Sequence, residues 1–216
     1  MRVAAYLFAE HGIAGTSVRD IADEVGMLSG SLYHHFSSKD AIAVAILGDF
    51  LADLNARYQS VLPHVVGMRQ QLRALVNSSI VIAEKHPYAT EIYQNERSLH
   101  GPESPAAIAE AVARAHEFWT ATATQASDAG ELRAELDPTD FARMLRESVW
   151  WSVRYHRDAL AERQDEITES LLAVFVDGAA TPIARDVKLT AAEEVITERL
   201  DRIEEALKSL DKNIIR

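Results

Sequence analysis

The feature that most constrains this fold is a pair of short helical segments that meet at Gly26. The first begins with residues 17–20, SVRD, in which a serine precedes an acid by three positions, the spacing of a capping box. Its apolar side chains then recur on one helical face, and the glycine ends the segment with a turn. This face consists of Val18, Ile21, Ala22 and Val25.

The segments on either side complete a recognisable unit. We expect a second short helix over roughly residues 29–35, and a much longer one from residues 37–40, SSKD, to about Leu62. A first helix over residues 3–11 stops at Gly12. Two short helices joined by a glycine turn, with a helix before and a long helix after, form a helix-turn-helix domain.

The rest of the chain also has a helical pattern nearly throughout, so the predicted fold class is all-α. Residues 64–182 contain five or so further helices interrupted by prolines. The clearest cover residues 91–97, 106–126 and 137–155. We therefore divide the chain into a helix-turn-helix head, a larger helical domain and a C-terminal extension. Their bounds are residues 1–45, 46–182 and 183–216.

The C-terminal extension carries a heptad pattern. Its apolar residues recur at alternating spacings of four and three, which is typical of a coiled-coil seam. The segment either pairs with itself in a dimer or lies on the body of the protein as a surface amphipathic helix. The pattern consists of Ile196, Leu200, Ile203, Leu207, Leu210 and Ile214.

The composition argues against several classes of protein. A net charge of −11 argues against non-specific binding to nucleic acid or to an anionic membrane. The absence of cysteine fits the reducing cytoplasm, and no apolar run approaches the roughly 20 residues of a membrane span. No nucleotide-binding, metalloprotease or hydrolase motif is present, so we expect neither an enzyme nor a cofactor. Adjacent His34 and His35 do not predict a metal, because neighbouring helical side chains diverge by about 100°.

The second short helix, SGSLYHH, is suited to the major groove of DNA. Small residues at its start bring free N–H groups and hydroxyls close to phosphates. A tyrosine and a histidine then extend outward, while Leu32 and Phe36 face inward and anchor the helix. The alternative is an ordinary helical hairpin whose serines only cap helices. The candidate DNA contacts are Ser29, Gly30, Ser31, Tyr33, His34 and Lys39.

These residues strongly resemble the DNA-binding domain of TetR-type transcriptional repressors over about residues 1–50. The resemblance implies a homodimer whose three-helix heads bind operator DNA, with a fourth helix leading to a variable ligand and dimerisation domain over residues 46–182. A ligand in that domain shifts the spacing of the heads and releases the DNA. The resemblance also adds Thr16 and Ser17 to the DNA contacts. It is carried by TSVRDIA at residues 16–22, Gly26, SGSLYHHF at residues 29–36, and Lys39.

Two departures from this family affect DNA binding. The first helix is short in comparison with the family, whose members usually have another turn and a basic arm before it. This predicts a truncated or alternative start, or weaker binding. Residues 1–50 contain three basic side chains against six acidic ones, a net charge of −3 that is unusual for a DNA-binding head. Contact through helix-end N–H groups and hydroxyls predicts a shallow dependence of binding on salt.

Residues 131–157 contain the clearest candidate ligand site. Arg146 and Trp150 are four residues apart and therefore lie on one helical face, and a guanidinium beside an indole suits a ligand with an anionic group and a flat or apolar body. Tyr93 and Gln94 supply further polar walls. In the alternative interpretation, the tryptophan packs in a core or dimer interface, Arg146 pairs with a helical acid, and the segment around Tyr93 is an ordinary solvated helix.

Within that family, the segments LSGSLYHHF, IYQNE and VWWSVRYHR resemble the actinobacterial regulators of steroid-ring catabolism, in patches over about residues 3–180. This resemblance implies an effector that is a CoA thioester of a degraded sterol, with Arg146 and Trp150 as ligand contacts. Other branches of the family bind drugs or fatty acyl-CoA, so the effector is either a CoA thioester or another small hydrophobic molecule, and one alternative is a regulator of drug efflux. The other is a helical interaction or scaffold protein that uses the C-terminal heptads and has a degenerate helix-turn-helix.

Overall fold

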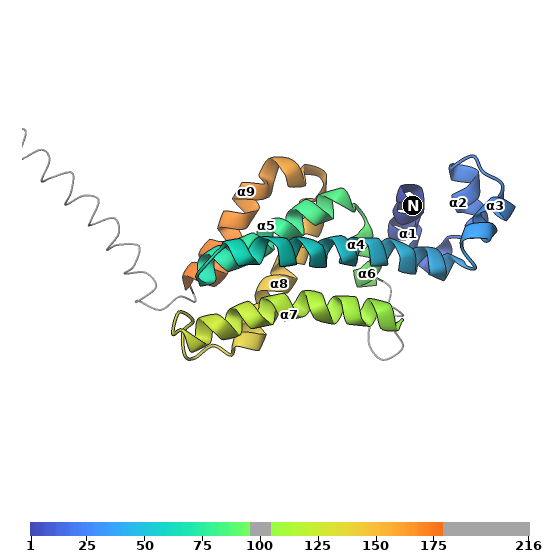
Figure 1. Cartoon of the computed structure of the whole chain (residues 1–216). Helices are drawn as coiled ribbons and strands as arrows, with labels where there is room; N and C mark the ends of the chain where they lie inside the picture. The colour runs from blue at the N-terminus through green and yellow to red at the C-terminus, as the bar shows by residue number, and fades with distance from the viewer. Residues whose placement is uncertain (96–104, 179–216) are drawn as a thin grey trace, which may run out of the picture.

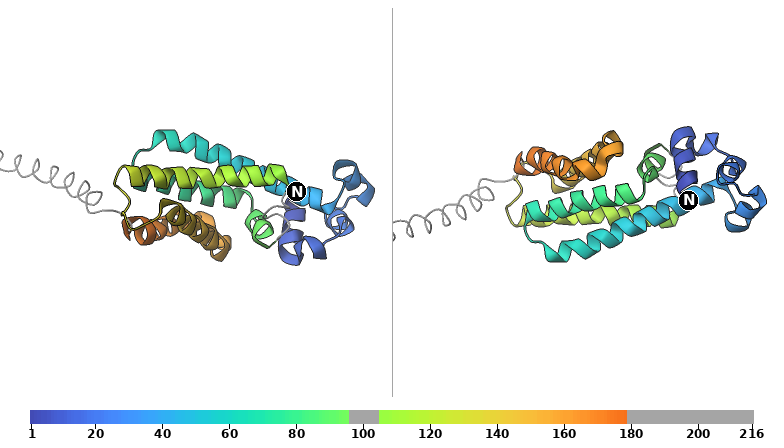
Figure 2. Two further views of the ribbon diagram at one scale, coloured as in Figure 1. Left: turned by 90° about the horizontal axis from the view of Figure 1, so that it is seen from below. Right: turned by 90° about the horizontal axis from the view of Figure 1, so that it is seen from above.

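One long helix, α4 (Lys39–Val61), joins the two parts of the molecule (Figure 1). The computed structural model describes residues 1–95 and 105–178, and the predicted heptads lie outside these ranges. The described residues confirm the all-α class, with a head of short helices at one end of α4 and the other helices around its remainder (Figures 1 and 2). The other α-helices are α1 (Arg2–Gly15), α2 (Val18–Glu24), α3 (Ser29–His35), α5 (Met68–Lys85), α6 (Ala89–Asn95), α7 (Ala106–Asp128), α8 (Pro138–Tyr155) and α9 (Leu160–Leu171), and α9 continues into a π-helical turn, η5 (Leu172–Asp177).

Capping interactions set the boundaries of the head helices. The Ser17 hydroxyl accepts a hydrogen bond from the N–H of Asp20 at 3.1 Å, and the Asp20 carboxylate accepts one from the N–H of Ser17 at 2.8 Å, which confirms the capping box. These hydrogen bonds lower the pKa of the Asp20 carboxyl. Gly26 has a φ of 69°, which L side chains rarely adopt. Because α2 ends at Glu24, Val25 lies beside the turn and is 38% exposed, contrary to its predicted place on the apolar face.

Thr16 has a different role from the one predicted for it. Its side chain is only 2% exposed, and its hydroxyl donates to the carbonyl oxygens of Gly12 at 2.9 Å and of Leu7 at 3.2 Å. These acceptors are available because Gly12, with a φ of 72°, interrupts α1. A buried hydroxyl held in this way cannot reach a phosphate. The structure therefore corrects the predicted DNA contact: Thr16 belongs to the interior of the head.

Lys39 ties the head to the start of α4. Its ammonium donates hydrogen bonds to the carbonyl oxygens of Ala14 at 3.0 Å and of Thr16 at 3.1 Å. An ammonium has three N–H groups, so one remains for the phosphate contact predicted from the sequence. Helix α4 begins as expected, because the hydroxyl of its N-cap Ser38 accepts a hydrogen bond from the N–H of Ala41 at 3.1 Å.

The body is a bundle in which α4 packs chiefly against α7 and α5. Its largest buried side chains include Tyr58, Leu72 and Trp119, each fully enclosed. On the outside, Arg69 of α5 pairs with Glu169 of α9 at 3.1 Å. Because this ion pair is partly exposed, it stabilises the fold by less than about 1 kcal/mol. The bundle therefore depends mainly on its apolar interior.

Helix α6 connects the head with the body, since it contacts α1, α4 and α8. Just before it, Tyr88 has a φ of 77°, which is unusual for a residue other than glycine. The Tyr88 ring meets the edge of Tyr6 in α1 at 5.5 Å between ring centroids, and the Arg157 guanidinium lies 5.4 Å from its centre. Residues 96 and 97, which the sequence placed in this helix, are outside the described ranges.

Two negative findings apply to the described ranges alone. No helix in them is both long and apolar enough to cross a bilayer. No three histidine, aspartate or glutamate side chains in them gather as a metal site.

Candidate functional site

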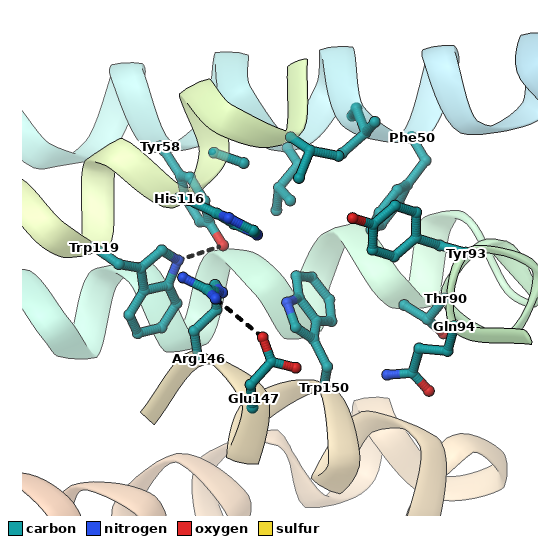
Figure 3. Close-up of a pocket in the computed structure, with 14 residues that line it drawn as sticks. Phe50, Tyr58, Thr90, Tyr93, Gln94, His116, Trp119, Arg146, Glu147 and Trp150 are labelled. Atoms are coloured by element: carbon teal, nitrogen blue, oxygen red, sulfur yellow. Dashed lines mark hydrogen bonds and ion pairs between the residues drawn. The ribbon is translucent and has the colours of Figure 1, made fainter. Parts of the chain in front are cut away.

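A cavity of about 330 Å³ lies between α4, α6, α7 and α8 (Figure 3). This volume is within the range of about 300–1,000 Å³ that is usual for small-molecule sites. The cavity brings together all four ligand contacts predicted from the sequence, Tyr93 and Gln94 from α6 and Arg146 and Trp150 from α8. Further side chains in its wall are Phe50, Tyr58, Thr90, His116, Trp119 and Glu147.

Arg146 is the main cation of this cavity. It is only 7% exposed, because the apolar side of α8 faces the bundle and Arg146 follows the buried Leu145. Its Nη2 donates to Glu147 at 3.0 Å, so the predicted pairing with a helical acid is present as well. Its Nε–H is buried and has no hydrogen-bond partner among residues 1–95 and 105–178. A buried donor without a partner is costly, so this end of the cavity is suited to an acceptor on a ligand.

A hydrogen-bonded chain behind Arg146 fixes the direction of the Tyr58 hydroxyl. Ser79 donates its one hydroxyl proton to the carbonyl of Leu75 at 2.8 Å, so it accepts from Tyr58 at 2.5 Å. The Tyr58 oxygen in turn accepts the indole N–H of Trp119 at 3.2 Å. Burial raises the pKa of Tyr58 to about 12, so its proton stays in place at neutral pH. The tyrosine thus holds the wall rigid and has no proton left to donate to a ligand.

His116 lies at the same end of the cavity, where Figure 3 shows its ring close to Tyr58 and Arg146. Burial, with the nearby Arg146 charge as a smaller cause, lowers the pKa of His116 to about 4. The imidazole is therefore neutral near pH 7. Sequence reasoning missed this residue, although its position three residues before the fully buried Trp119 on α7 was an available signal.

The other end of the cavity, which Figure 3 shows with Phe50 and Trp150, carries no charged side chain among its labelled residues. The Trp150 ring meets the edge of Phe50 at 5.8 Å between centroids, and Phe50 meets His86 in the same manner at 6.0 Å. His86 Nε2 lies 2.6 Å from Asp53, and Lys85 pairs with the same carboxylate. Phe50 and Asp53 both belong to α4, so the cavity wall and the linking helix share these contacts.

The head presents most of its predicted DNA contacts on one surface. Tyr33 is 58% exposed and His34 is exposed, while Leu32 and Phe36 pack against the core. At the start of α3, Leu28 is the N-cap and has no side chain that accepts from the first N–H groups. Ser29 and Ser31 are half-buried beside exposed Gly30, and Ser17 at the start of α2 is also exposed. A second helix with an open N-terminus and an exposed tyrosine has the form of a recognition helix.

A helix-turn-helix head joined to a helical domain with a cavity is the arrangement of ligand-controlled helix-turn-helix regulators. Comparison with known protein families identifies the family within this class. Residues 1–46 match the family described as "Bacterial regulatory proteins, tetR family", and residues 66–179 match "Tetracyclin repressor-like, C-terminal domain". The chain belongs to the TetR family, and it is a transcriptional repressor rather than an enzyme.

The chain is similar over most of its length to repressors from actinobacteria. It is 36% identical to the HTH-type transcriptional repressor KstR2 of Rhodococcus jostii over 83% of this chain and 89% of that protein. For KstR2 of Mycobacterium tuberculosis the identity is 33%, over 82% of this chain and 90% of that protein. A solved structure described as the ketosteroid transcriptional regulator KstR2 of Mycobacterium tuberculosis superposes with a TM-score of 0.72 over 83% of this chain and 92% of that one.

Proposed function

We propose that this repressor binds operator DNA as a homodimer and is released by an acyl-CoA-type metabolite with a compact, ring-containing acyl group. The single observation that carries the proposal is the cavity, which joins a guanidinium whose buried Nε–H has no partner among the described residues to an aromatic wall. The names of the relatives support a steroid-derived acyl group, because a ketosteroid regulator shares the fold and a third of the residues. CoA itself is much larger than the acyl groups in question, so we place in 330 Å³ only the acyl end and at most one adjoining anionic group.

The proposed DNA contacts are Ser17 at the start of α2, Ser29, Gly30, Ser31, Tyr33 and His34 on α3, and Lys39 at the start of α4. Few cations are available to the head for long-range attraction. Arg19 pairs with Asp23 at 3.7 Å, and Lys39 already binds two carbonyl oxygens. Contacts through N–H groups and hydroxyls must therefore supply much of the affinity.

Replacing Tyr33 by alanine is expected to weaken operator binding by roughly tenfold, because the exposed ring and hydroxyl extend from the recognition helix. Fluorescence anisotropy with the operator upstream of the repressor's own operon measures the loss, and circular dichroism checks that the head remains folded. Tyr33→Phe is the matched control, which removes only the hydroxyl and should have an intermediate effect. If the Tyr33→Ala protein bound the operator with unchanged affinity, the placement of α3 in the major groove would be wrong.

The effector is expected to enter with its anionic group towards Arg146 and its rings beside Trp150. In this geometry the buried Nε–H gains an acceptor, and the indole covers an apolar face of the ligand. A cationic drug would meet the buried guanidinium instead, which disfavours a role in drug efflux.

Titration of the repressor–operator complex with the CoA thioester of a two-ring steroid fragment should release DNA. Arg146→Met and Trp150→Leu should each raise the concentration needed for release by roughly tenfold or more while operator affinity stays unchanged. Stearoyl-CoA is the comparison ligand, since its long chain does not match the compact cavity. Equal release from wild-type protein and both variants would reject the proposed site.

The dimer is expected to form through exposed apolar side chains on α8 and the π-helical turn η5. Trp151 and Tyr155 are 64% and 71% exposed and stack on one another at 5.3 Å between ring centroids, and Val174 of η5 is 70% exposed. Aromatic surface of this kind is unusual on a monomer and typical of an interface. A two-fold axis would bring Trp151, Tyr155 and Val174 of one copy against the same residues of the other.

Trp151→Glu should convert the dimer largely to monomer at micromolar concentration, because it places a charge in an apolar interface. Sedimentation velocity measures the mass. Val66→Glu, at an 88% exposed position before α5, is the control and should remain dimeric. A Trp151→Glu protein with the full dimer mass would place the interface elsewhere.

A further inference from the structure

His116 is the polar group of the cavity that the proposed function leaves without a role. It lies on α7 opposite Arg146 of α8, and Figure 3 shows the two side chains at one end of the cavity. Neither ring nitrogen has a hydrogen-bond partner within residues 1–95 and 105–178, although the side chain is half-buried. The neighbouring Tyr58 cannot satisfy it as a donor, because the Tyr58 proton is directed to Ser79. The Nε–H of Arg146 and the imidazole are therefore donors at this end that are available to a ligand.

We infer that His116 and Arg146 together bind an anionic oxygen group of the effector, and that His116 takes up a proton when this group enters. The inference rests on the proposed function, since it concerns the same cavity. The anionic group is a carboxylate or a phosphate, either of which accepts hydrogen bonds from both side chains. His116 would therefore be a ligand-binding residue whose charge changes between the free and the bound repressor.

The electrostatics of the cavity give the direction of this change. The charged and titratable groups that share the cavity with His116 are Arg146 and Glu147 of α8, Tyr58 of α4 and Tyr93 of α6. Burial and Arg146 hold the pKa of His116 at about 4, while Glu147 opposes them more weakly. A bound anion offsets the guanidinium charge and favours the imidazolium, so it raises this pKa.

The sign of the pH dependence follows from this change. The complex holds more protons than the free protein, so effector affinity rises as the pH falls from about 7.5 towards 5.5. If the anion brings the pKa of His116 to about 6, affinity rises about three- to fivefold over that interval. A neutral carbonyl in the same place would accept the same hydrogen bonds without this uptake of a proton.

Calorimetry with wild-type, His116→Gln and His64→Gln proteins tests the inference. Glutamine keeps a donor and an acceptor but does not titrate, and His64 is an exposed histidine remote from the cavity. The probes are a two-ring steroid carboxylic acid and its CoA thioester, each titrated near pH 6 in two buffers of different ionisation enthalpy. Wild type and His64→Gln should take up about half a proton or more beyond His116→Gln. Uptake with the free acid identifies the carboxylate, and uptake with the thioester alone identifies a phosphate.

Equal proton uptake by His116→Gln and wild type would overturn the inference and leave the proposed effector class standing. Failure of both probes to bind wild-type protein would reject the proposed function and this inference with it. Nuclear magnetic resonance of the wild-type imidazole gives a second readout that does not depend on folding of the variant. Its titration midpoint should rise by at least about one pH unit when the probe is bound, and an unchanged midpoint would contradict the inference.

Discussion

The contact between Phe50 and Trp150 is the interaction on which the rest of the structure depends, because it places a cavity wall on the helix that carries the head. Phe50 lies in α4, whose first residue, Lys39, binds the end of α1. The same ring touches His86, and the Asp53 carboxylate one helical turn later binds that histidine. In the proposed mechanism, a ligand that moves Trp150 acts through Phe50 on the 23-residue helix α4. A displacement of α4 would be carried to the head at its first residue.

Helix α6 provides a second connection between the two parts. Thr90, Tyr93 and Gln94 reach the cavity, while Tyr88 at the start of the helix packs on Tyr6 of α1. In Figure 1, α6 lies beside α1, away from α3. The contacts of α6 with the cavity and with α1 therefore leave α3, the proposed recognition helix, exposed.

The sequence predicted the head closely because its structure is decided locally. The capping box at Ser17 and the left-handed turn at Gly26 depend only on neighbouring residues, so spacing alone revealed them. Thr16 was misassigned because the fate of its hydroxyl depends on the break at Gly12, which leaves acceptors nine and four residues away. The sequence also predicted a phosphate contact for Lys39. Its hydrogen bonds to Ala14 and Thr16 could not be predicted from the sequence, because they form only where the end of α1 meets the start of α4.

The grouping of residues around the cavity was predicted in part, for a different reason. Arg146 and Trp150 share a face because α-helical geometry puts residues four apart together. Arg146 and Trp150 line one cavity with Tyr93 and Gln94 because α6 packs near α8. This tertiary contact was predicted from residue types alone. His116 was missed because a single histidine on an apolar face gives no sign of what lies opposite. Only the packing of α7 against α8 shows that its neighbour is a buried guanidinium.

The distance between the two heads of the proposed dimer is the most direct test of the account. The chain contains no cysteine, so Glu10→Cys on the exposed side of α1 gives one spin-label site per copy without further changes. Double electron–electron resonance then measures the head-to-head distance with and without the steroid CoA thioester. The account predicts a shifted distance distribution in the wild-type background and little shift in Trp150→Leu. An unchanged distribution under conditions where calorimetry shows bound ligand would contradict a mechanism in which the cavity controls the heads through α4.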